Sequence, residues 1–261
     1  MPHRYDTYLF RFFVVWYAIG VILLSFHLVP PWLEWANVVF LITSGLLGIF
    51  YFIRSGGRAG ITAVIIIFFG SMAVESLGVH TGLFFGDYTY ETDFGPKLIG
   101  VPITIGFAWV MVLATTHVLA APVMKWNFPA GGFLYIVYGS LAAVIMDLII
   151  DPVAYDVKQY WVWNEGGLYY DIPFSNFAGW FILSAVFHAL LLLFFRKNKR
   201  WTNVHSLFWS IRMRWLYVMM TGMFIVVALA NGLVLAPVLT AVLVAAVVVF
   251  YQFMQRAGGP A

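Results

Sequence analysis

Three acidic residues interrupt segments of the chain that are otherwise long and apolar. Glu75, Asp147 and Asp151 each fall within such a segment or at its end. An ionisable side chain at membrane depth costs about 2.5–3.5 kcal/mol even on the lenient insertion scale, so it is a functional candidate by default. We therefore predict that Glu75, Asp147 and Asp151 are the catalytic residues of this protein.

The spacing of the two aspartates favours acid chemistry. Asp147 and Asp151 are four residues apart, which places both carboxyl groups on one face of a helix. Two neighbouring carboxyl groups in an apolar setting cannot both ionise cheaply, so we expect one to hold a proton near neutral pH and to act as a general acid. A structural use stays open, in which Asp151 ends the helix before Pro152 while Asp147 and Glu75 tie neighbouring helices together.

Aromatic and polar side chains surround these acids in the sequence. We predict that eight of them bind the substrate: Tyr88, Tyr90, Trp109, Trp163, Tyr170, Asn176, Trp180 and His80. Trp and Tyr gather at membrane interfaces in any case, but aromatic faces beside an acid also stabilise a carbocation. An isoprenoid is the expected substrate class, because it dissolves in the bilayer and becomes a tertiary cation when an acid protonates its trisubstituted alkene.

The elements that position these residues follow from the composition. Of 261 residues, 63% are hydrophobic and 10% are charged, whereas soluble domains are about 45–50% apolar and about 25% charged. Eight apolar segments are long enough to cross a bilayer, roughly 11–29, 37–53, 60–79, 98–120, 132–150, 177–195, 215–234 and 236–254. We predict an all-α, polytopic transmembrane helical bundle that forms a single integral membrane domain over residues 1–261.

The residues between and beside these segments predict how the last two are connected and how the bundle is oriented. Only Asn231, Gly232 and Pro237 separate the last two segments, which predicts either a hairpin or one kinked helix. Of the 14 Lys and Arg residues, all but Lys97 and Lys158 fall on the side of the N-terminus, so the positive-inside rule predicts a cytoplasmic N-terminus in a multi-pass protein of the cell (inner) membrane. The acids, apart from Asp6, fall in the opposite half, where we expect the chemistry.

Two long connections, about 80–97 and 151–176, precede similar motifs. Pro102 and Pro173 each open a segment, and each is followed seven residues later by a Trp. Glu75 lies 27 residues before Pro102, and Asp147 lies 26 before Pro173. This indicates a parallel duplication of a helix–loop–helix unit with substrate between the copies, although Pro at helix starts and Trp in membranes are also common separately.

Other kinds of site find little support in the sequence. The chain has no cysteine, no lysine in the middle of a segment, and no histidines four residues apart, so we expect neither a metal nor another cofactor. Asp147 and Asp151 would suit Mg²⁺ and a diphosphate, as in membrane prenyltransferases. Such a site also needs bases for the phosphates, and this side of the membrane offers only Lys97 and Lys158.

A combination of motifs covers residues 70–185. They are Glu75-x-x-Gly78-x-x-Thr81-Gly82-x-x-Phe85-Gly86-x-Tyr88-x-Tyr90, Gly95-Pro96-Lys97-Leu98-x-Gly100-Val101-Pro102, Asp147-x-x-x-Asp151-Pro152, Trp161-x-Trp163, and Tyr169-Tyr170-x-Ile172-Pro173-x-x-Asn176-Phe177-x-Gly179-Trp180. In these motifs the chain resembles the membrane-embedded carotenoid hydratases, which include acyclic carotenoid 1,2-hydratases and bisanhydrobacterioruberin hydratase-like proteins.

The resemblance implies a hydro-lyase without a redox cofactor. It would add water to the terminal double bond of a membrane-dissolved acyclic carotenoid, lycopene- or γ-carotene-like, and give a tertiary alcohol. A lycopene cyclase-like enzyme is the close alternative, because it quenches the same cation with an internal alkene instead of water. A proton-coupled transporter or lipid-binding membrane protein is another, but a transporter should carry polar groups to both faces, and here the acids stop in one half.

Overall fold

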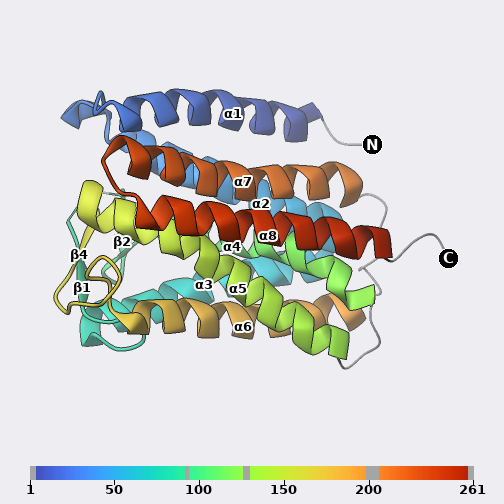
Figure 1. Cartoon of the computed structure of the whole chain (residues 1–261). Coiled ribbons are helices and arrows are strands. Elements are labelled where there is room, and N and C mark those ends of the chain that lie inside the picture. Colours follow the sequence, from blue (N-terminus) through green and yellow to red (C-terminus); the bar gives the residue numbers. More distant parts are fainter. Residues whose placement is uncertain (1–3, 92–93, 126–129, 198–205, 258–261) are drawn as a thin grey trace.

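The predicted bundle of eight spans is confirmed by a computed structural model, which describes residues 4–91, 94–125, 130–197 and 206–257. Eight helices of these residues are long and apolar enough to cross a membrane. They are α1 (Arg4–Ser25), α2 (Trp35–Gly56), α3 (Arg58–Thr81), α4 (Ile103–Ala120), α5 (Ala130–Pro152), α6 (Phe174–Lys197), α7 (Ser206–Ala230) and α8 (Leu235–Ala257). Figure 1 shows them running side by side along one axis.

The last two apolar segments form a hairpin of two helices. α7 ends at Ala230, where the Asn231 side chain donates a hydrogen bond to the Val227 carbonyl at 2.8 Å and Gly232 takes a positive φ of 83°. Pro237 then lies in the first turn of α8, where a missing backbone N–H costs nothing. The turn therefore decides between the two predicted arrangements.

Several predicted helix boundaries were wrong; α1, for example, begins at Arg4 and not near residue 11. α7 begins at 206 instead of 215, because Arg212 and Arg214 continue the helix and donate hydrogen bonds to carbonyls of its own preceding turn. α4 begins at Ile103 instead of 98, because β2 (Lys97–Leu98) and β3 (Val101–Pro102) form a small antiparallel hairpin before it. Hydropathy predicts which residues are apolar enough to lie in the membrane. It does not predict where the helical hydrogen bonds begin, so the helix can start before or after the apolar segment.

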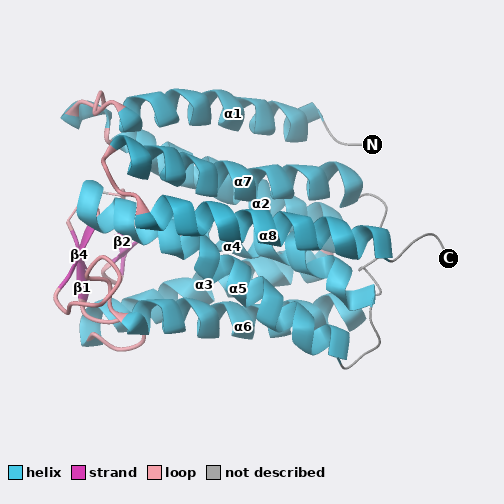
Figure 2. Cartoon of the chain, viewed as in Figure 1, coloured by secondary structure: helices cyan, strands magenta, loops and turns pink. Residues whose placement is uncertain are grey.

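The strands of the described residues lie at one end of the bundle, here called the strand end (Figure 2). α1 begins and α8 ends at the opposite end. β1 (Tyr88–Tyr90) pairs antiparallel with β4 (Trp161–Trp163), so the two long connections meet over the helices. α4 is the most buried of the eight spans, whereas α1 lies at the edge and packs mainly against α2 and α7 (Figure 1).

Two helix–loop–helix units meet at the strand end. The first consists of α3, β1 and α4, and the second of α5, β4 and α6. Besides the β1–β4 pair, they share a stacked contact between Trp109 and Trp180, whose ring centroids are 4.5 Å apart at an interplanar angle of 29°. The two units therefore contact each other directly, and their origin by duplication stays a prediction.

Candidate functional site

Glu75 lies in a shell of three hydrogen-bond donors. α3 carries it less than two turns before the strand end, where it is 7% exposed. The indole N–H of Trp109 donates to Oε1 at 3.0 Å, while the hydroxyls of Tyr88 and Tyr90 donate to Oε2, Tyr90 at 3.4 Å. Both tyrosines come from β1, so the strand fixes them above the carboxyl group.

The two tyrosines keep their protons near neutral pH. Burial raises the pKa of Tyr88 well above its ordinary value, and the charge of Glu75 raises it further. Burial and the same charge also raise the pKa of Tyr90, to which Asp151 adds a smaller effect. Tyr90 is therefore within electrostatic reach of both Glu75 and Asp151.

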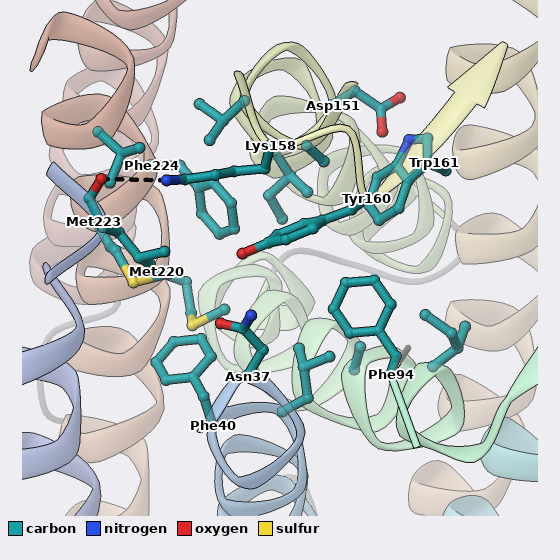
Figure 3. Close-up of a pocket in the computed structure, with 18 of the residues that line it drawn as sticks. Asn37, Phe40, Phe94, Asp151, Lys158, Tyr160, Trp161, Met220, Met223 and Phe224 are labelled. Atoms are coloured by element: carbon teal, nitrogen blue, oxygen red, sulfur yellow. Dashed lines mark hydrogen bonds between the residues drawn. The ribbon is translucent and has the colours of Figure 1, made fainter. Parts of the chain in front are cut away.

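Asp147 and Asp151 share one amide. Both are buried on α5, and the Asn176 side chain of α6 donates from Nδ2 to Asp147 Oδ2 at 2.8 Å and to Asp151 Oδ2. The indole of Trp161 also hydrogen-bonds to Asp151, and Figure 3 shows the two side chains next to each other. The second oxygen of Asp147, Oδ1, is buried without a hydrogen-bond partner in the described chain.

No cation pairs with these three acids among the described residues. The ion pair found there joins Arg54 to Asp6 at 3.6 Å, on other elements. No three His, Asp or Glu side chains in the described chain are placed to share a metal ion. Hydrogen bonds from neutral side chains are therefore what compensates the buried acids.

A cavity of about 170 Å³ brings most of the predicted residues together at the strand end. Eight of them line it: Glu75, Tyr88, Tyr90, Trp109, Asp151, Trp163, Asn176 and Trp180. The rest of the lining is mainly apolar. Among the described residues, Glu75 and Asp151 are the only carboxyl groups that face this space. Carboxyl groups beside aromatic faces are the groups that acid catalysis through a carbocation requires.

Three predicted site residues do not line the cavity. Asp147 is fully buried and contacts Asn176, which itself reaches the cavity. The Tyr170 hydroxyl accepts a hydrogen bond from the backbone N–H of Ala236 at 3.1 Å, so it joins the second connection to α8. His80 is exposed, and its Nδ1 bonds to the Ser76 carbonyl within α3.

Several cavity residues were not predicted from the sequence. Lys158 reaches across the cavity and donates from Nζ to the Leu24 carbonyl of α1 at 3.3 Å (Figure 3). Burial lowers the pKa of this ammonium group, and burial raises the pKa of Tyr160 to about 12 although Asn37 hydrogen-bonds to it. The sequence could have indicated Lys158, because it is one of only two bases that depart from the positive-inside rule. The apolar residues from α1, α2 and α7 carried none, because lipid-facing helices use the same residue types.

Two other buried histidines lie in the half of the bundle away from the strand end. His117 Nδ1 is 2.6 Å from the Tyr135 hydroxyl, and His188 lies between the Ser184 carbonyl and the Thr116 hydroxyl. These contacts join α4 to α5 and to α6, and neither histidine lines the cavity.

Comparisons with known proteins identify the family of the chain. The family model described as "Carotenoid biosynthesis protein" matches residues 36–248. A bisanhydrobacterioruberin hydratase from Haloarcula japonica is 30% identical over 139 residues, which make up 53% of this chain and 45% of that protein. The chain thus spans about half the length of the curated relative that it matches. No solved structure matches the chain.

Proposed function

Because the chain belongs to the carotenoid biosynthesis protein family, we propose that it is a membrane-embedded hydratase that adds water to the terminal double bond of an acyclic carotenoid. The observation that carries the proposal is the pair Asp151 and Glu75, two carboxyl groups facing one apolar, aromatic-walled cavity. In this proposal the protein lies in the cell membrane with its N-terminus in the cytoplasm and its strand end outside, and it uses no redox cofactor.

Asp151 is the proton donor in this mechanism. Its carboxyl group gives a proton to the alkene carbon that already bears hydrogen, and the alkene's π electrons form the new C–H bond. The positive charge then rests on the tertiary carbon. Indole and phenol faces of Trp163, Trp180 and Tyr88 line the space that this cation occupies and stabilise it.

Glu75 receives the second proton. A water molecule attacks the tertiary carbon, and the carboxylate of Glu75 removes a proton from the oxygen as the C–O bond forms. Water has then been added as H and OH, Asp151 has lost one proton, and Glu75 has gained one. The cycle closes when Glu75 gives up this proton and Asp151 regains one before the next substrate reacts.

Asp147 acts through its neighbours in this scheme. It holds the Asn176 amide that also binds Asp151, so it positions the proton donor without touching the substrate. We therefore assign Asp147 a positioning role, while Asp151 and Glu75 contact the reacting atoms.

Expression in cells that accumulate lycopene tests the function directly. We expect a pigment heavier by one water molecule, detected by mass spectrometry of the extracted carotenoids, with an empty-vector strain as the control. A product of unchanged mass but altered absorbance would indicate a cyclase, which quenches the same cation internally. Unchanged pigment across several acyclic carotenoids would contradict both enzymes.

A further inference from the structure

The cavity is too small for the whole substrate of the proposed reaction. At about 170 Å³ it is close to the engineered cavity of about 150 Å³ that holds one benzene molecule. A carotenoid end group fits such a space, but the polyene attached to it does not. The polyene must leave the cavity between helices, and the cavity lining shows where.

The two ends of the cavity differ in chemistry. Figure 3 shows Asp151 and Trp161 at one end, with Met220, Met223 and Phe224 of α7 at the other. The described lining at the α7 end has no carboxyl group. Its ammonium group, Lys158 Nζ, is held by the Leu24 carbonyl, and its methionines are flexible enough to fit an irregular apolar chain. An end group protonated by Asp151 would therefore direct its polyene towards α7.

α1 closes the same side of the cavity. Its lining residues are Trp16, Gly20, Leu23 and Leu24, which form one face of the helix. α1 is the least buried span, and it lies at the edge of the bundle against α2 and α7. A chain that passes beneath α1 thus reaches lipid without crossing the protein core.

Gly20 marks the open point of this face. A Cβ atom added at Gly20 would meet no atom within 4 Å, although the residue lines the cavity. Resting on the proposed function, we infer that the gap between α1, α2 and α7 at Gly20 is a lateral passage, through which the polyene of the bound carotenoid extends into the bilayer. Gly20 then determines specificity for long substrates.

The passage predicts that blocking Gly20 discriminates by substrate length. We expect Gly20→Phe to lower lycopene conversion at least tenfold and to leave conversion of farnesene, a much shorter hydrocarbon with the same alkene end, within twofold of wild type. The matched control is Ala18→Phe, which adds the same side chain at an exposed position of α1 outside the cavity. Undiminished lycopene conversion by Gly20→Phe would overturn the passage.

A second experiment measures lycopene binding in the passage independently of catalysis. The chain has no cysteine, so Gly20→Cys and Ala18→Cys each supply a single thiol. In detergent micelles we expect lycopene to slow maleimide labelling at position 20 several-fold and to leave position 18 unchanged. Equal labelling at position 20 with and without lycopene would refute the passage. Protection at position 20, together with a wild-type protein that hydrates nothing, would instead refute the proposed function and retain the passage.

Discussion

The two helix–loop–helix units both place acidic and aromatic residues at the cavity, but they differ in how many hydrogen-bond donors surround each carboxyl group. In the first unit, α3 supplies Glu75, β1 supplies two tyrosines and α4 supplies Trp109. In the second, α5 supplies Asp151, with Asp147 one turn behind it and outside the cavity, β4 supplies Trp161 and Trp163, and α6 supplies Trp180. The units meet at the β1–β4 ladder and at the Trp109–Trp180 stack.

Their hydrogen bonding shows the difference. Three donors serve the single carboxyl group of Glu75. In the second unit Asn176 and Trp161 serve two carboxyl groups, and Asp147 Oδ1 receives no donor in the described chain. Three donors can replace the water that a buried carboxylate loses, whereas two donors cannot do so for two carboxylates. We therefore assign the proton donor to the second unit and the acceptor to the first.

Asp151→Asn tests this division with the largest expected effect. An amide cannot give the alkene a proton, so we expect hydration of lycopene to fall by about 10²–10⁴-fold. Product formation in membranes, normalised to the amount of folded protein, measures it. Asp156→Asn, the same substitution at an exposed position five residues away, should retain full activity. An active Asp151→Asn variant would move the proton donor out of the second unit.

Glu75→Gln should have a smaller effect of about 10–100-fold. The proton still reaches the alkene from Asp151, but the cation loses a nearby negative charge and the attacking water loses its base. The same assay measures the loss, and Glu91→Gln, at an exposed position after β1, is the matched control. A loss greater than that of Asp151→Asn would reverse the roles of the two units.

Asp147→Asn should cost about tenfold. The new side chain can still accept the hydrogen bond from Asn176 but leaves a buried amide partly unpaired, a cost of about 1–3 kcal/mol. Part of that cost appears in the folded state, so the thermal midpoint in detergent should fall along with the rate. A loss as large as that of Asp151→Asn would show instead that the two aspartates act as one proton-sharing pair.

Particular residues explain how far the sequence alone could lead. The eight spans were predictable because apolar length and charge placement are local properties, and Glu75 and Asp151 were conspicuous as acids within apolar segments. Asp147 carried the same signal, yet only the packing of α5 against α6 places it outside the cavity. Gly20, Met220 and Phe224 were not predictable, because a residue that faces a cavity and one that faces lipid obey the same preference for apolar types.

The smallest effects are expected from substituting the two stacked tryptophans, Trp109 and Trp180. Trp109→Phe keeps an aromatic ring in the stack but removes the donor to Glu75 Oε1, so we expect about a fivefold loss of hydration, close to 1 kcal/mol. Trp180 is not among the described donors to Glu75, so Trp180→Phe should cost no more than about twofold. Rates of the two variants, measured side by side on lycopene, separate hydrogen bonding from stacking. Equal losses would mean that the ring faces, which both units supply alike, matter more than the donor that the first unit alone provides.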